Sequence, residues 1–282
     1  MSPLGNRARR RNQKIMTYGL LAVVLSVVLF PIYWMIITAL KSESEITRRI
    51  PTFFPEHPTL VNAMDLFVRS PVPQQMLNSL VIASSVTIVA LAISSMGSYS
   101  ISRLRFPGRD FLAASVFFSY LVPGSLVLIP LYTLFAQLGL LNSQFGVGLA
   151  YMSFAIPFST WMLKGYFGNI PKDLEEAALV DGCNRMQALA KVILPLAAPG
   201  MVASAIFCFT LSWNEFLLAF VFLNKKELLT FPVGLASLIY GDRFLWGQIM
   251  TGATLMSAPV LVLYFMAQRY IVTGLTAGAV KG

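Results

Sequence analysis

Five stretches of this chain run for more than 20 residues without a charged side chain. A helix that crosses a membrane needs about 20 mostly apolar residues, so each stretch can hold at least one span. The apolar residues are continuous rather than alternating, which favours helices over strands. The five stretches are Ile15–Leu40, Ser70–Ser102, Phe111–Leu163, Val192–Asn214 and Phe244–Gln268.

The stretch Phe111–Leu163 is too long for one helix. It is interrupted by LGLLNSQFG (Leu138–Gly146), whose Gly, Asn and Ser residues are typical of a turn. We therefore predict an all-α membrane protein with six transmembrane helices. The predicted helices cover about residues 15–40, 75–99, 111–135, 145–167, 199–223 and 246–270.

Prolines lie inside the third and fourth predicted helices, at Pro123, Pro130 and Pro157, and are expected to kink them. In a membrane, the freed carbonyl groups need neighbouring helices or a water-filled cavity as partners. Two interpretations remain open: ordinary packing of a helix bundle, or a bundle that encloses a pathway.

Charged residues make up 12% of the 282 residues, against about a quarter in soluble domains. With the N-terminus in the cytoplasm and six spans, the inner segments hold 14 of the 21 Lys and Arg residues. This bias follows the positive-inside rule, so we expect both termini in the cytoplasm. The net charge of +9 thus indicates membrane topology and not nucleic-acid binding.

We divide the chain into a basic cytoplasmic tail (1–14), a six-helix membrane domain (15–272) and a cytoplasmic C-terminal tail (273–282). The first helix would also suit a signal peptide, but its apolar run is too long and no A-x-A site follows. We expect it to be retained. Cys183 falls in a predicted cytoplasmic loop and Cys208 inside the fifth predicted helix, so we expect no disulfide between them in a reducing compartment. The lone His57 has no cysteine or carboxylate cluster beside it, so we expect no metal site.

A short acidic segment, PKDLEEAALVDG (Pro171–Gly182), precedes the fifth predicted helix. Pro171 suits a first helical turn, where its missing N–H has no partner in any case. Three carboxylates follow in the early turns, near the positive end of the helix dipole. Gly182 suits a left-handed C-terminal cap. The segment therefore predicts a compact helix.

One face of this helix is expected to carry Leu174, Ala177, Ala178 and Asp181, which are spaced three and four residues apart. The two alanines keep the face flat, so that another backbone can approach closely. The net charge of the segment is negative, which opposes binding to the negative cytoplasmic leaflet. We therefore expect a protein partner.

Several short sequences resemble one family. EAALVDG (176–182), with Leu194-Pro195 downstream, resembles the EAA loop of bacterial ABC-importer permeases, although Cys183 stands where that loop usually has alanine. LNSLVIA, RLRFPGR and SWNEFLLAF are similar to the carbohydrate importers of this family. The tail QRYIVTGLTAGAVKG (268–282) resembles that of the second membrane subunit of maltose-type transporters. The resemblance covers essentially the whole chain.

This resemblance implies a type I ABC-importer permease fold, in which loop 169–198 inserts its helix into a cleft of a cytoplasmic ATPase. The implied ATPase-coupling residues are Glu175, Glu176, Ala177, Ala178, Asp181 and Gly182. The tail is implied to reach into the ATPase dimer through Gly274, Leu275, Thr276, Gly278 and Lys281. The chain has no G-x-x-x-x-G-K-[ST] phosphate loop, so ATP and Mg are expected on a partner ATPase and no cofactor on this chain.

Candidate residues of the substrate path are Trp213, Asn214, Glu215, Tyr120 and Tyr151. A carboxylate inside an apolar run, such as Glu215, is by default a functional candidate. It could instead pair with a lysine of a partner at the outer rim. Trp213 could stack on a sugar ring, although aromatic residues in spans also serve packing. The resemblance implies that the other membrane subunit makes most sugar contacts.

We expect a permease subunit, not an enzyme, of an importer for a carbohydrate or polyol in a bacterial cytoplasmic membrane. The expected partners are a second permease subunit, an ATPase dimer and an external solute-binding protein. A different cargo, such as a glycerophosphodiester, would keep the same mechanism. A stand-alone secondary transporter would need internal repeats and buried ion-coupling carboxylates. A membrane scaffold or receptor without transport is a third class.

Overall fold

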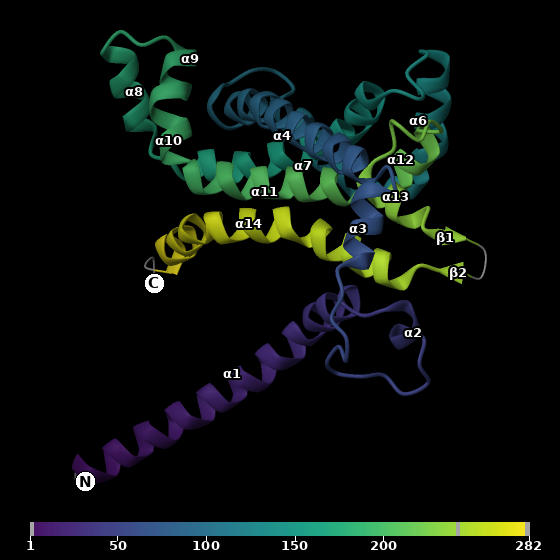
Figure 1. Cartoon of the computed structure of the whole chain (residues 1–282). Helices are drawn as coiled ribbons and strands as arrows, with labels where there is room; N and C mark the ends of the chain where they lie inside the picture. The colour runs from purple at the N-terminus through teal and green to yellow at the C-terminus, as the bar shows by residue number, and fades with distance from the viewer. Residues whose placement is uncertain (1–2, 241–242, 280–282) are drawn as a thin grey trace. The chain divides into compact units, whose positions relative to one another are not determined.

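The computed structural model describes residues 3–240 and 243–279, and these residues are mostly helical (Figure 1). The chain forms two compact units, which are described separately. Unit 1 consists of Met1–Ser70 and Leu238–Ser257, and unit 2 of Pro71–Ser237 and Ala258–Gly282. Helix α14 (Trp246–Ala279) contributes its first part to unit 1 and its remainder to unit 2.

Unit 1 is built around the end of the first long helix and the segment that follows it. That helix is α1 (Pro3–Ala39), and the other elements are α2 (Glu43–Ile46), α3 (Val61–Val68) and the antiparallel pair β1 (Ile239–Tyr240) and β2 (Arg243–Phe244). The side chain of Asn62 donates hydrogen bonds to the carbonyls of Ala39 (2.9 Å) and Lys41 (2.7 Å). This amide therefore satisfies the backbone where α1 ends and fixes α3 beside it.

Unit 2 has a core of three helices. Its elements before α14 are α4 (Val72–Arg103), α5 (Arg109–Leu121), α6 (Gly124–Gln137), α7 (Gln144–Asn169), α8 (Lys172–Val180), α9 (Arg185–Ala188), the π-helix η1 (Leu189–Ile193), α10 (Leu194–Leu196), α11 (Ala198–Asn214), α12 (Leu217–Phe222) and α13 (Phe231–Ala236). Helices α4 and α7 lie side by side, and α11 packs against both (Figure 1). Small residues such as Ala90 and Ala150 are fully buried where these helices meet.

Four helical segments are long and apolar enough to cross a membrane: Asn12–Ala39, Val72–Arg103, Gln144–Asn169 and Trp246–Gln268. Two further pairs of helices pass the same criteria but are bent, Arg109–Leu121 with Gly124–Gln137 by 100° and Arg185–Leu196 with Ala198–Asn214 by 84°. The prediction of helices in these regions is confirmed. Six spans result if each bent pair counts as one span.

Two of the predicted helices are interrupted, which the sequence analysis did not anticipate in full. The third was expected to kink at Pro123, but it ends at Leu121 and restarts at Gly124 with a sharp bend. The prediction of a continuous helix over 199–223 is wrong, because α11 ends at Asn214 and α12 begins at Leu217. Pro130 and Pro157, in contrast, lie inside α6 and α7.

The predicted turn at 138–146 is confirmed. Gly139 and Asn142 both have positive φ angles, of 68° and 54°, which a glycine or asparagine adopts most readily. Asn142 donates its backbone N–H to the carbonyl of Phe222 and accepts a hydrogen bond from the backbone of Asn224. The turn between α6 and α7 is thus tied to the end of α12.

Helices α7 and α11 approach each other closely at Gly200. A Cβ atom at this position would lie 2.4 Å from the ring of Tyr166 on α7, which is shorter than any tolerated contact. We expect Gly200→Ala to lower the free energy of unfolding by about 1–3 kcal/mol, as overpacked cores do. Gly165→Ala, on α7 with no atom within 4 Å of the added Cβ, is the matched control and should be neutral or stabilising. Unfolding in mild detergent, followed by tryptophan fluorescence, measures both; equal effects would contradict the close contact.

Candidate functional site

The loop between α7 and α11 begins with the compact helix that the sequence predicts. Helix α8 follows Pro171, and Gly182 closes it with a left-handed φ of 87°. The N–H of Cys183 bonds to the carbonyl of Ala178 (3.0 Å), and that of Gly182 bonds to the carbonyl of Leu179 (3.1 Å). This pair of hydrogen bonds is a Schellman motif, which ends the helix sharply.

The exposed face of α8 differs from the predicted one. Ala178 is only 8% exposed and Glu175 is 6% exposed, so both belong to the side that packs on the rest of unit 2. Ala177, Asp181 and Leu174 are exposed, as expected. The expectation that Ala178 lies on a free, flat face is therefore wrong. The helix turns this alanine inward because its own chain supplies a packing surface there.

A buried polar cluster anchors α8 to the end of α4. The hydroxyl of Tyr99 donates to Oε1 of Glu175 (2.5 Å), and Nε of Arg103 lies 3.6 Å from Oε2 of the same carboxylate. The side chains of Arg103 and Glu175 are 3% and 7% exposed. Arg103 also donates through Nη2 to the carbonyls of Phe167 and Ile170, where α7 ends. One arginine thus connects the ends of α4 and α7 to α8.

The second half of the loop packs onto the same helix ends. Asn184 and Gln187 form a reciprocal capping box at the start of α9, with both hydrogen bonds at 2.9 Å. The following π-helix η1 buries Leu189 and Ile193 in a cluster with Tyr99 and other apolar residues of α4 and α7. The segment from α9 through α10 is helical, so α8 through α10 form one structured element.

A cavity of about 550 Å³ separates α8 from the segment between α4 and α5. Its walls include Lys172, Glu176 and Arg185 from the loop and Arg105 and Phe106 from that segment. The exposed side of α8 and the segment 104–108 therefore bound a polar hollow on the same side of unit 2.

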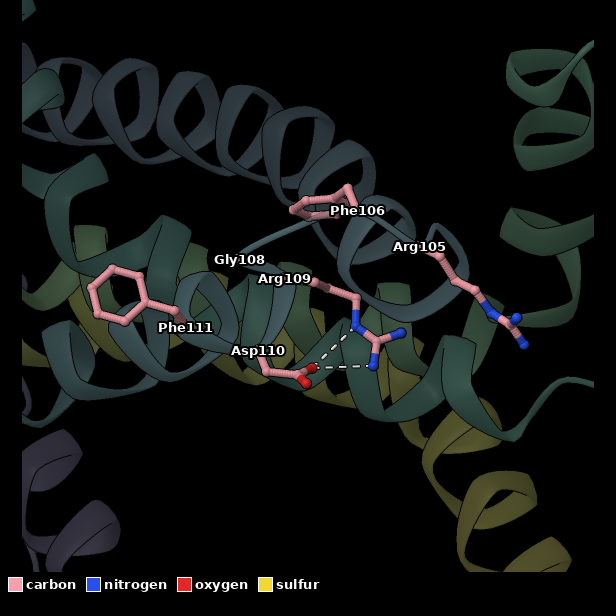
Figure 2. Close-up of a pocket in the computed structure, with 6 residues that line it drawn as sticks. All are labelled: Arg105, Phe106, Gly108, Arg109, Asp110 and Phe111. Atoms are coloured by element: carbon pink, nitrogen blue, oxygen red, sulfur yellow. Dashed lines mark hydrogen bonds and ion pairs between the residues drawn. The ribbon is translucent and has the colours of Figure 1, made fainter.

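The segment between α4 and α5 holds a second, more open hollow of about 370 Å³ (Figure 2). Gly108 turns the chain with a φ of 81°, and Arg109 pairs with Asp110 at 3.1 Å. Arg105 extends away from this pair (Figure 2). The arginines of the RLRFPGR sequence thus have different roles, because Arg103 is buried with Glu175 while Arg105 is exposed.

Glu215 caps the start of α12. Its carboxylate accepts hydrogen bonds from the backbone N–H groups of Leu218 (3.0 and 3.1 Å) and Ala219 (3.2 Å). The carboxylate satisfies backbone groups that the helix break leaves free, which explains how an ionisable residue is accommodated within an apolar run. Glu215 was predicted either to contact substrate or to form an ion pair at the outer rim. The structure instead shows that it caps a helix of its own chain.

The other predicted path residues are scattered. Trp213 is 1% exposed, with its ring stacked on Phe209 and edge-on to Phe231, so the open stacking face expected for it is covered. Tyr151 is fully buried in the core, while Tyr120 and Asn214 are exposed. The five residues are absent from the linings of five cavities in the described part of the chain.

Sequence reasoning missed an apolar cavity of about 540 Å³ between α7, α11 and the part of α14 in unit 2. Phe158, Phe207, Thr210 and Tyr264 are among its lining residues. Each of these is an ordinary residue of an apolar helix, so no local pattern in the sequence distinguishes them from packing residues.

The predicted ATPase-contact tail is only partly covered by the structure. Helix α14 continues through Gly274, Leu275, Thr276 and Gly278 to Ala279, whereas Lys281 lies outside the described residues. Side chains beyond Gln268 are also outside the description, so the role of the tail stays a prediction.

Comparison with known proteins gives a family match. Residues 88–276 match the family model described as binding-protein-dependent transport system inner membrane component. The chain is 35% identical to the inner membrane ABC transporter permease protein YcjP of Escherichia coli, covering 97% of this chain and 99% of that protein. It is 36% identical to the diacetylchitobiose uptake system permease protein DasC of Streptomyces coelicolor, over 93% and 95% of the two chains.

Two further similarities bear on fold and family. The trehalose/maltose transport system permease protein MalG of Thermococcus litoralis is 32% identical over 93% of this chain and 95% of its own length. A chain from the crystal structure of a bacterial ABC transporter involved in the import of the acidic polysaccharide alginate aligns with a TM-score of 0.79 at 23% identity. That alignment covers 92% of this chain and 96% of the other, which confirms the predicted type I importer fold.

The buried cluster at α8 predicts a specific pattern of stability changes. Glu175→Leu leaves the guanidinium of Arg103 buried without its carboxylate and should lower the free energy of unfolding by about 3–5 kcal/mol. The double variant Arg103→Met with Glu175→Leu should lose less than the sum of the two single variants. Glu176→Leu, at the exposed neighbouring position, should change it by no more than about 0.5 kcal/mol. Denaturant titrations in detergent measure these values, and equal losses for Glu175→Leu and Glu176→Leu would refute the cluster.

Proposed function

Because the chain belongs to the family of binding-protein-dependent transport system inner membrane components, we propose that it is a permease subunit of an ATP-driven importer for a carbohydrate or polyol. The observation that carries this proposal is the α8–α10 loop, an acidic helix that is exposed on one side and anchored to α4 and α7 on the other. An anchored helix of this kind can pass a push from a partner to the helices of the bundle.

In this proposal, the predicted residues that couple the ATPase to the membrane helices lie on two sides of α8. Glu176, Ala177, Asp181 and Gly182 are exposed and form the side that meets the ATPase. Glu175 and Ala178 face inward and connect α8 to its own bundle. When the two ATPase subunits bind ATP and close, α8 moves. The contacts of Arg103 with Glu175 and with the end of α7 then move the ends of α4 and α7 together.

The ATPase is a separate subunit, and ATP and Mg bind there. The sequence supports this, because it lacks a phosphate-binding loop that could hold the nucleotide. A second permease subunit completes the membrane part, and an external solute-binding protein delivers the cargo. ATP and the loaded binding protein then shift the balance between states that open to opposite sides of the membrane.

The chain crosses a bacterial cytoplasmic membrane six times, with both termini in the cytoplasm. Counting each bent pair as one span supports the number, and the distribution of Lys and Arg supports the orientation. In this topology α8, the segment 104–108 and the C-terminal tail all lie on the cytoplasmic side. The segment 41–70 lies outside.

The carbohydrate cargo rests on the relatives, whose names assign them to diacetylchitobiose and to trehalose or maltose. A glycerophosphodiester would use the same mechanism and remains the alternative cargo. A secondary transporter is disfavoured, because Glu215, the carboxylate that could have coupled an ion, is engaged in capping α12.

The docking role of α8 is tested by Ala177→Trp, which adds a bulky ring to the exposed side without disturbing buried contacts. We expect the tagged importer, purified in mild detergent from its native host, to retain its second permease and lose most of its ATPase. Val68→Trp, at a site that is 79% exposed on α3, is the control and should keep the ATPase. If Ala177→Trp retains as much ATPase as the control, the ATPase does not dock on this side of α8. If the unmodified chain purifies without any ATPase, the importer proposal is refuted.

A further inference from the structure

Unit 1 contains a cavity that the proposed transport mechanism does not use. It has a volume of about 260 Å³ and lies between the end of α1, the segment 41–52 and the start of α14. Two indole rings, those of Trp34 and Trp246, contribute to its walls. Its polar lining comes from Thr38, Lys41, Glu45 and Thr52. A hollow that combines indole rings with charged groups has the lining of a ligand site.

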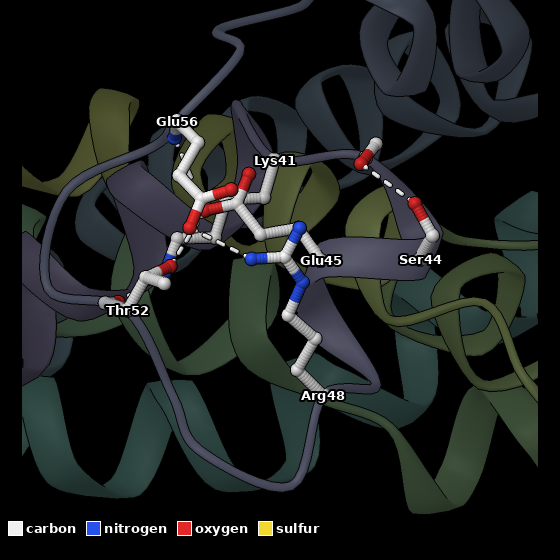
Figure 3. A network of polar contacts seen from close by, with 7 residues as sticks. Lys41, Ser44, Glu45, Arg48, Thr52 and Glu56 are labelled. Atoms are coloured by element: carbon white, nitrogen blue, oxygen red, sulfur yellow. Dashed lines mark hydrogen bonds and ion pairs between the residues drawn. The ribbon is translucent and has the colours of Figure 1, made fainter.

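The two charged side chains in this cavity are buried, each only 3% exposed. Lys41 donates to the backbone carbonyl of Thr52, and its ammonium group lies 4.9 Å from the centre of the Trp34 ring. Oε1 of Glu45 accepts hydrogen bonds from the hydroxyl of Thr52 (2.5 Å) and from the N–H of Glu56 (3.2 Å) (Figure 3). The neighbouring pair Arg48 and Glu56, at 2.7 Å, is in contrast about half exposed.

Both charged groups keep hydrogen-bonding capacity within the described part of the chain. An ammonium group has three donors, and Lys41 uses one of them on Thr52. A carboxylate has two acceptor oxygens, and the contacts of Glu45 all involve Oε1. Buried charges are costly unless they are paired or hydrogen-bonded, so a ligand that supplies the missing partners is favoured here.

The carboxylate remains ionised at neutral pH. The hydrogen bond from the Thr52 hydroxyl holds the pKa of Glu45 below its usual value, with smaller contributions from the Glu56 N–H, Lys41 and Arg48, while burial acts in the opposite direction. Glu45 therefore presents an acceptor, and Lys41 presents donors, at the wall of one cavity.

We propose that this cavity is a subsite for one ring of a neutral carbohydrate, an inference that rests on the proposed function. One sugar hydroxyl donates to Oε2 of Glu45, and another oxygen accepts from Lys41. The apolar face of the ring packs on Trp246, which is 39% exposed and has Phe244 stacked at 5.1 Å. In the proposed topology the subsite lies on the outer side, where a binding protein releases its cargo.

The chemistry of the cavity distinguishes a sugar from other small ligands. An anion would be repelled by Glu45 and a cation by Lys41, whereas an apolar ligand would leave both groups without partners. A polyhydroxylated ring has donors and acceptors at its edge and C–H groups on its faces. It therefore matches the carboxylate of Glu45, the ammonium group of Lys41 and the indole rings. The volume is below the range of about 300–1,000 Å³ typical for drug-sized ligands, which suits a single ring.

The test uses fluorine NMR of the assembled importer in lipid nanodiscs, with 5-fluorotryptophan incorporated. The four tryptophans of this chain, Trp34, Trp161, Trp213 and Trp246, are assigned through single Trp→Phe variants. Maltose, trehalose and diacetylchitobiose are titrated to about 50 mM, so that dissociation constants well above about 1 mM are detected. We expect at least one sugar to shift the resonances of Trp34 and Trp246 while Trp161, in unit 2, stays unchanged.

Two matched variants assign the effect to the cavity. Glu45→Gln keeps the shape of the side chain but removes its charge, and should weaken the sugar titration roughly tenfold or more. Glu56→Gln changes an exposed carboxylate just beyond the segment 41–52, whose side chain does not line the cavity, and should leave the titration unchanged. Equal titrations for the two variants would overturn the subsite, as would shifts confined to Trp213 or the absence of shifts with all three sugars.

Uptake of radiolabelled sugar by cells, measured in parallel, separates this inference from the proposed function. Uptake that depends on ATP, without shifts at Trp34 and Trp246, would refute the subsite and leave the importer intact. Loss of both the ATPase partner and uptake would refute the importer itself.

Discussion

Backbone hydrogen bonding in an apolar surrounding is the constraint on which this structure depends. A continuous helix satisfies its own N–H and carbonyl groups, and each interruption needs partners from nearby side chains or turns. Three interruptions have such partners: Glu215 caps α12, Asn142 bonds to the end of α12, and the turn at Gly182 closes α8 with a Schellman motif. These polar and turn-forming residues thus lie where helices stop.

The α8–α10 loop shows how this constraint also connects three helices. Arg103 ends α4 and donates to the carbonyls of Phe167 and Ile170 at the end of α7. The guanidinium satisfies these carbonyls and at the same time pairs with Glu175 on α8. Because one side chain meets three elements, α8 cannot shift without disturbing the ends of both long helices.

Local sequence patterns predicted the features whose causes are local, and missed those whose causes are not. The helical regions, the turn at 138–146 and the caps of α8 follow from apolar runs and from Gly, Asn and Pro at defined positions. The partnership of Arg103 with Glu175 joins residues far apart in the chain, so no spacing rule could identify it. Ala178 and Trp213 were misjudged for a related reason, since their burial depends on which neighbours the fold brings to them.

The position of Arg103 has a consequence for how the protein is made. During synthesis α4 enters the membrane well before α8 exists, so the guanidinium at its end begins without its carboxylate partner and without the carbonyls of α7. Until then the charge must stay in contact with water at the membrane surface, which holds the end of α4 at the interface and fixes how deeply that helix inserts. The α8–α10 loop, which is synthesised last of the three elements, therefore completes the burial of Arg103, and the bundle reaches its final arrangement only when the proposed docking surface is in place.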